Sequence, residues 1–98
     1  MARVELAPEV ADDFERIFEH LAQHDPEAAS RRLPEIIEAL SILGSNPLIG
    51  RPAQNELREL VIGRRSKGYV ALYRYLPDID VVFVLAIRGQ REAGYAGD

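Results

Sequence analysis

Residues 69–88 read YVALYRYLPDIDVVFVLAIR, and this stretch decides the fold. Its first part, Tyr69–Leu76, is rich in aromatic residues and predicts a β-strand. The next four residues, 77–80 (PDID), are typical of a turn. Residues 81–88 are apolar up to the final arginine and do not alternate, which predicts a central strand covered on both faces. We therefore expect two antiparallel strands here, with the second in the interior of the sheet.

Two further strands and a loop are expected before this pair. Arg58–Ile62 predicts a strand that a turn over residues 63–68 connects to the next strand. Arg3–Leu6 predicts a short strand at the N-terminus, and residues 48–55, which contain glycine and proline, predict a loop.

Two helices are expected between the first strand and this loop. The first begins near Pro8, and the second begins with Asp25 as N-cap and Pro26 in its first turn. Gly44 should end the second helix, and Pro34 predicts a kink or a break within it. The apolar stripes at helical spacing are Val10, Phe14, Ile17, Phe18 and Leu21 in the first helix and Leu33, Ile36, Ile37, Leu40 and Leu43 in the second.

The element order is thus β-α-α-β-β-β, an α+β fold in a single domain of residues 1–98. The three later strands should form an antiparallel meander, and the helical hairpin should pack on one face of it, because both apolar stripes need a partner surface. A chain of 98 residues has enough surface to bury for one core.

Composition excludes several classes of protein. The chain has no cysteine, so disulfides and thiolate chemistry are impossible. The longest apolar run, residues 81–87, is far shorter than the roughly 20 residues of a membrane span. The N-terminus lacks the apolar core of a secretory signal, so a cytoplasmic location is expected. The net charge of −4 is unlike that of a typical nucleic-acid-binding domain.

Metal or cofactor chemistry is not expected. No phosphate-binding or dinucleotide motif occurs. His20 and His24 have the i, i+4 spacing of a metal-binding pair, but histidines at a helix C-terminus also suit the helix dipole. The acidic side chains of the first helix, Asp12, Asp13, Glu15 and Glu19, are expected on its solvated face.

Two groups of residues are candidates for binding. Tyr69, Tyr73 and Tyr75 share one strand face, where they could stack RNA bases or pack the sheet, and packing is favoured. The tail after the central strand carries arginine and tyrosine, the residues typical of interface hot spots. The predicted target- or partner-binding residues are Arg64, Arg65 and Lys67 of the turn and Arg88, Arg91 and Tyr95 of the tail. The alternative for the tail is a solvated terminus.

The chain resembles the RelE/ParE family of toxins from type II toxin–antitoxin modules, and it is closer to the ParE-like side, called plasmid stabilisation proteins. The resemblance covers nearly the whole chain and implies the fold given above. It also implies a growth-inhibiting toxin whose partner is a cognate antitoxin, in a toxin–antitoxin hetero-oligomer. The matching segments, in order, are VELAPEVADDFERIFEHLA, DPEAASR, SNPLIGRP, LRELVIGRRSKGYVALYRY and VVFVLAIRGQREAGY.

The family divides by target. RelE-like members cleave mRNA in the ribosomal A site with lysines and arginines on the sheet and a C-terminal arginine and tyrosine, whereas ParE-like members poison DNA gyrase. The resemblance places Val61 and Gly63 where RelE-like members carry lysines and Val70 where they carry an arginine. Valine and glycine supply no acid, base or cation. The prediction is therefore a ParE-like gyrase inhibitor that is not an enzyme.

Two alternatives remain open. One is a ribosome-dependent mRNA endonuclease with a different set of residues, for which Arg65, Lys67, Arg88, Arg91 and Tyr95 are the candidates. Its partners would be the ribosome and mRNA. The other is a non-toxic protein that binds its antitoxin and acts as a co-regulator.

Overall fold

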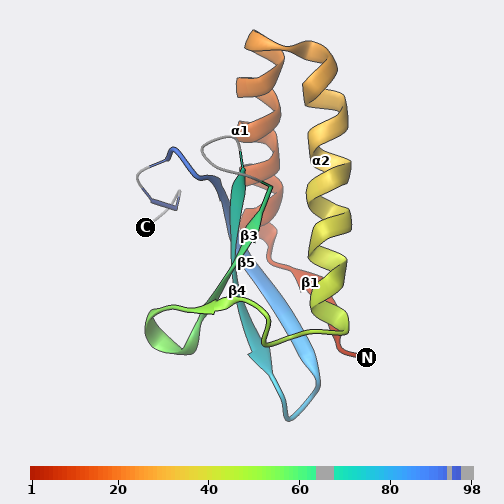
Figure 1. Cartoon of the computed structure of the whole chain (residues 1–98), viewed down its shortest axis with the longest axis vertical. Coiled ribbons are helices and arrows are strands. Elements are labelled where there is room, and N and C mark those ends of the chain that lie inside the picture. The colour runs from red at the N-terminus through yellow and green to blue at the C-terminus, as the bar shows by residue number, and fades with distance from the viewer. Residues whose placement is uncertain (64–67, 93, 96–98) are drawn as a thin grey trace.

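The computed structural model describes residues 1–63, 68–92 and 94–95, and in them two helices lie against one face of a five-stranded sheet (Figure 1). The helices are α1 (Pro8–His24) and α2 (Pro26–Leu40), and a 3-10 turn, η1 (Ser41–Gly44), follows α2. The strands, in their order across the sheet, are β1 (Arg3–Leu6), β5 (Val81–Gly89), β4 (Tyr69–Leu76), β3 (Arg58–Ile62) and β2 (Arg51–Pro52). The predicted α+β class and helical hairpin are confirmed.

The sheet is mixed. The meander β3–β4–β5 is antiparallel as predicted, while β1 pairs with β5 in parallel. The prediction of a continuous loop over residues 48–55 is wrong at Arg51–Pro52, which forms the short edge strand β2. A tight turn, in which the Ala53 N–H donates to the Leu57 carbonyl at 2.8 Å, brings this dipeptide alongside β3.

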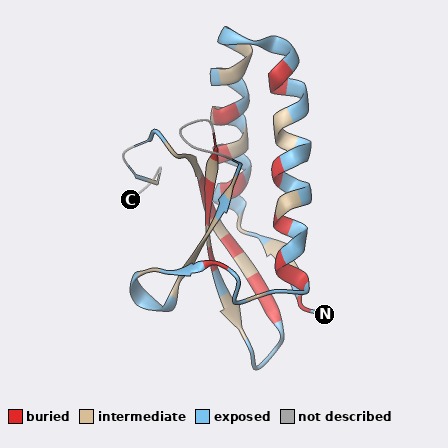
Figure 2. Ribbon diagram, viewed as in Figure 1, coloured by how far each residue is buried: buried red, intermediate tan, exposed pale blue. Residues whose placement is uncertain are grey.

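The apolar strand β5 lies inside the sheet, between β1 and β4, as its composition predicts. Its residues Val82, Val84 and Ile87 are fully buried on the helix side (Figure 2). The register with β4 shifts by one residue, because Tyr73 pairs with Val84 and Leu72 pairs with Ala86. This bulge lets Val84 and Ile87, three residues apart, face the same side of the sheet.

The hairpin begins and turns as the sequence predicts. Asp25 caps α2, since its Oδ1 accepts the Ala28 N–H at 3.2 Å. The predicted break at Pro34 is wrong, because α2 continues through it. Pro34 and Ser30 are both exposed, so water can bind the carbonyl group that the missing N–H leaves free. In the described part of the chain, neither helix combines the length and apolarity needed to cross a membrane.

The apolar stripes are narrower than predicted. Ile17 and Ile36 are buried, but their neighbours Phe18 and Ile37 are 40% and 51% exposed. Consecutive helical residues are about 100° apart, so only one of each pair faces the core. Asp13, predicted on the solvated face, is instead only 3% exposed. Asp13 follows Val10 by three residues and therefore shares the buried face of α1.

The packing role predicted for the tyrosines of β4 is confirmed. Tyr73 is fully buried, and Tyr69 and Tyr75 pack against the same core. The Tyr73 hydroxyl accepts the Gly50 N–H and donates to the Pro47 carbonyl, both at 2.8 Å. A Cβ at Gly50 would lie 2.6 Å from the Tyr73 ring, so this position requires glycine. These tyrosines face the helices and are therefore not arranged to stack RNA bases.

Two neighbouring isoleucines of α2 provide a matched test of the packing. Ile36→Ala should lower the free energy of unfolding by about 2–5 kcal/mol, because it leaves a cavity in the core. Ile37→Ala should lower it by less than about 1 kcal/mol, because half of that side chain already contacts water. Chemical denaturation of both variants measures the difference, and equal losses would contradict the orientation of α2.

Candidate functional site

The end of β5 carries the chain from the core to the surface. Ile87 is fully buried, and the next residue, Arg88, is half-buried. A turn follows, in which the Glu92 N–H donates to the Gly89 carbonyl at 3.1 Å. We call residues 88–92, 94 and 95 the C-terminal segment. Because it leaves a rigid interior strand, its starting point is fixed.

One row of side chains crosses the face of the sheet that points away from the helices. Val61 of β3 pairs with Val70 of β4, and Val70 pairs with Arg88 of β5. Ala71, the neighbour of Val70 in β4, packs in the core on the helix side of the sheet. Because strand side chains alternate between faces, the row of Val70 lies on the other face. We call this the open face. Val61 is 44% exposed and Val70 only 1% exposed, and Arg88 is the single cation of the row.

Tyr95 folds back onto the open face. Its hydroxyl donates to Oε2 of Glu59 at 2.6 Å, and the Arg88 guanidinium lies 5.1 Å from the centre of its ring. Burial and the Glu59 carboxylate raise the pKa of Tyr95 well above its ordinary value. The hydrogen bond from Tyr95 lowers the pKa of Glu59, and Arg51, whose Nε lies 3.1 Å from Oε1, lowers it further. This arrangement holds a neutral phenol against a carboxylate.

Arg88 also holds the turn that follows it. Its Nη1 donates to the carbonyl oxygens of Gly89 and Glu92, both at 3.2 Å. Its Nε is buried and has no hydrogen-bond partner among the described residues.

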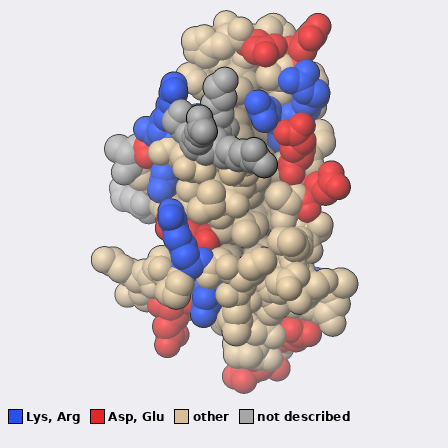
Figure 3. All heavy atoms as spheres, viewed as in Figure 1, with Lys and Arg blue, Asp and Glu red and all other residues tan. Residues whose placement is uncertain are grey.

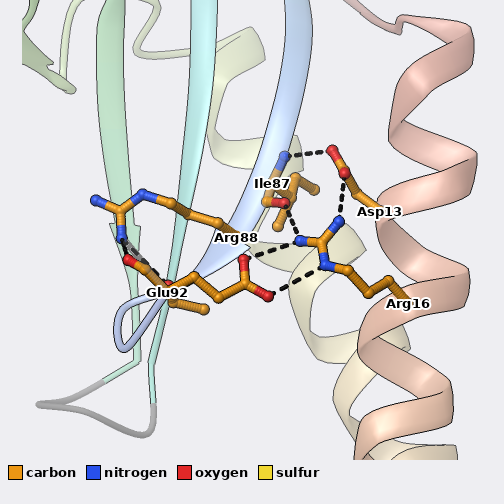
Figure 4. Close-up of polar contacts among 6 residues, drawn as sticks. Asp13, Arg16, Ile87, Arg88 and Glu92 are labelled. Carbon is orange, nitrogen blue, oxygen red and sulfur yellow. Dashed lines mark hydrogen bonds and ion pairs between the residues drawn. The ribbon is translucent and has the colours of Figure 1, made fainter. Parts of the chain in front are cut away.

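A chain of polar contacts ties the C-terminal segment to α1 (Figure 4). Asp13 accepts the Ile87 N–H at 2.9 Å and an Arg16 N–H at 2.7 Å. Arg16 donates to the Ile87 carbonyl at 3.1 Å. Its Nε and Nη2 also donate to the two carboxylate oxygens of Glu92, at 3.1 and 2.9 Å. Such a two-pronged pair has a defined geometry as well as favourable charge.

A groove of about 870 Å³ lies on the helix side, where the hairpin meets the ends of β4 and β5. Figure 1 shows that the hairpin extends beyond the strands at this end. The floor of the groove includes the apolar side chains of Ile17, Leu21 and Tyr69, while Arg32 and Arg91 contribute positive charge. Arg16, Asp25 and Glu92 also line the groove, which thus combines apolar side chains with charges of both signs.

The structure separates residues that the sequence analysis grouped. Arg88 and Tyr95 lie together on the open face, whereas Arg91 lines the groove on the helix side. The three predicted turn residues, Arg64, Arg65 and Lys67, lie outside the described residues.

The charged side chains are unevenly placed. Figure 3 shows a broken column of Lys and Arg along the left of the face in view and a second group at its upper right, next to Asp and Glu, while the lower middle of that face is largely uncharged. His20 and His24 contact each other edge to face, with ring centroids 4.8 Å apart, at the groove end of α1. No group of three or more potential metal ligands occurs within residues 1–63, 68–92 and 94–95.

Four residues that organise the site were not predicted from the sequence: Asp13, Arg16, Glu59 and Glu92. For Asp13 a signal was present, because it lies three residues after Val10 and four before Ile17, on the apolar stripe. Arg16 stands one turn further along the same helix. Nothing in the local sequence marks Glu59, since its partner Tyr95 lies 36 residues away.

Comparisons with known proteins match this architecture. Residues 4–94 match the model of a family described as the ParE toxin of the type II toxin–antitoxin system parDE. A curated relative from Caulobacter vibrioides, Toxin RelE3, is 32% identical over 82 residues, which are 84% of this chain and 89% of that protein.

A solved structure described as the chromosomal ParDE TA system from P. aeruginosa has the same fold. It superposes with a TM-score of 0.77 at 24% identity, over 91% of this chain and 96% of that one. The family match spans nearly the whole chain and includes the hairpin and the C-terminal segment as far as residue 94, so Tyr95 lies just beyond it. The chain therefore belongs to the ParE toxins, within the RelE/ParE family of type II toxin–antitoxin systems.

Proposed function

We propose that this toxin inhibits DNA gyrase by binding to it, has no catalytic site of its own, and acts in the cytoplasm until a cognate antitoxin neutralises it. The observation that carries this proposal is the composition of the row Val61–Val70–Arg88 on the open face. Two of its three positions cannot ionise.

Cleavage of RNA would require more than this row offers. Attack of a ribose 2′-hydroxyl on a phosphate needs a general base, a general acid and cations for the developing charge. Val61 and Val70 provide none of these, and Gly63 at the end of β3 has no side chain. Burial and the Glu59 carboxylate raise the pKa of the Tyr95 phenol, which disfavours a role for it as a base.

The same face is well suited to binding a protein. Arg88 and Tyr95 combine a cation with an aromatic ring, as residues at the centre of interfaces do. We include Arg91 and the turn residues Arg64, Arg65 and Lys67 in the proposed target- or partner-binding set. Local positive charge of this kind attracts an anionic partner surface even in a chain of net charge −4.

A second candidate function is ribosome-dependent cleavage of mRNA. The pairing of Arg88 with Tyr95 favours it, and one relative carries the name RelE3. A third possibility, a non-toxic co-regulator of the antitoxin, would leave growth unaffected.

Two reactions with the purified toxin separate these functions. We expect inhibition of supercoiling by DNA gyrase, and intact mRNA when the toxin is added to translating ribosomes. Arg88→Ala should weaken gyrase inhibition by at least about tenfold, because it removes the only cation of the row. Cleavage of mRNA in the ribosomal A site would instead establish the endonuclease function, and absence of growth arrest on expression would establish the co-regulator.

We propose the groove beside α1 and α2 as the docking place of the antitoxin. The apolar floor suits a bulky apolar side chain, and Arg32 and Arg91 suit neighbouring carboxylates. A segment that is disordered when free could fold on this surface as it binds.

Charge reversal at the groove tests this docking. Arg91→Glu should weaken binding to the antitoxin encoded beside the toxin by about tenfold, equivalent to about 1.4 kcal/mol. The control is Arg31→Glu, an equal change of charge on the exposed surface of α2, which should leave the affinity within about twofold. Calorimetry measures both, and equal losses would mean that only net charge matters.

A further inference from the structure

On the side of β5 that faces away from β4, the backbone N–H and C=O groups find hydrogen-bond partners of two different kinds along the strand. β1 pairs with Val81–Val84, and the next backbone bond, from the Ala7 N–H to the Val84 carbonyl, ends this pairing. Past the bulge, the N–H and carbonyl of Ile87 bind side chains of α1 instead. Asp13 accepts and Arg16 donates, as the backbone of a neighbouring strand would do.

These contacts orient the Arg16 side chain towards the end of β5. Its contacts with Asp13 and Ile87 fix the guanidinium from one side. Its remaining donors then point towards the turn after the strand, where both oxygens of Glu92 accept from them. A guanidinium held in this way presents a preformed fork for one carboxylate.

Glu92 lies between the residues of the C-terminal segment that face the helix side of the sheet and those that lie on the open face. Arg91, one residue earlier, lines the groove on the helix side. Tyr95, three residues later, reaches Glu59 on the open face. The backbone of Glu92 itself binds Gly89 and Arg88, so its position determines the shape of the turn.

We propose that Arg16 and Glu92 are positioning residues, which hold the C-terminal segment so that Tyr95 stays beside Arg88 on the open face. This inference rests on the proposed function, in which that segment contacts the target. Neither residue needs to touch the target. They influence target binding indirectly, by fixing the turn that precedes Tyr95.

Glu92→Ala is the appropriate variant, because it leaves the contacts among Asp13, Arg16 and Ile87 in place. The control is Glu5→Ala. Glu5 also pairs with an arginine, Arg3, at 3.5 Å, and its side chain is 39% exposed compared with 38% for Glu92. Glu92→Gln keeps one acceptor for Arg16 and should give an intermediate result.

Two measurements are made on each variant: hydrogen exchange of the amides in the C-terminal segment, and growth arrest on expression. In Glu92→Ala we expect exchange at residues 90–92 to rise about tenfold and growth arrest to weaken, while core amides keep their protection. Glu5→Ala should behave like the parent in both measurements.

Unchanged exchange in Glu92→Ala would overturn the proposal, whatever the effect on growth, because the segment would then be held by other contacts. Faster exchange with full growth arrest would also overturn it, since the position of the segment would not matter to the target. If the parent toxin causes no arrest at all, the proposed function fails, and the exchange data alone still decide whether Glu92 holds the turn.

Discussion

The hydrogen bond between the Asp13 carboxylate and the Ile87 N–H is the contact on which the arrangement of α1 and the C-terminal segment depends. A buried carboxylate is costly unless its oxygens are bonded, and here one oxygen binds the strand while the other binds Arg16. Because β1 is too short to reach this part of β5, these two side chains complete the sheet edge. The helix is thereby fixed against the strand in one register.

The contact between Asp13 and Ile87 connects the core to the surface, because Asp13 also holds Arg16 and Arg16 binds Glu92. β5 is rigid because it lies between two strands and under α1, so the direction in which Arg88 leaves it is determined. Arg16, held by Asp13, then receives Glu92 from the turn. The Arg16–Glu92 pair thereby ties the C-terminal segment to α1. A helix near the other end of the chain, α1, thus helps to hold the C-terminal segment in place.

The sequence predicted those features that depend on local pattern. The apolar run of β5 indicated an interior strand, and Asp25 indicated the cap of α2. It did not predict the burial of Asp13, because an acidic residue among other acidic residues suggests a solvated face until its partner, 74 residues away, is known. Nor could it separate Arg91 from Tyr95, because the turn between them, and not their spacing, sends them to opposite sides of the sheet.

The chemistry of the open face favours a protein target over RNA. Interfaces with nucleic acids are polar and strongly positive, because phosphate neutralisation supplies much of the affinity. Interfaces between proteins have an apolar centre, poor in charge and enriched in arginine and tyrosine. On this face Val61 is an exposed apolar side chain, while Val70 is buried and Arg88 lies over the Tyr95 ring. In a chain of net charge −4, these features support the proposed protein target more than an RNA target.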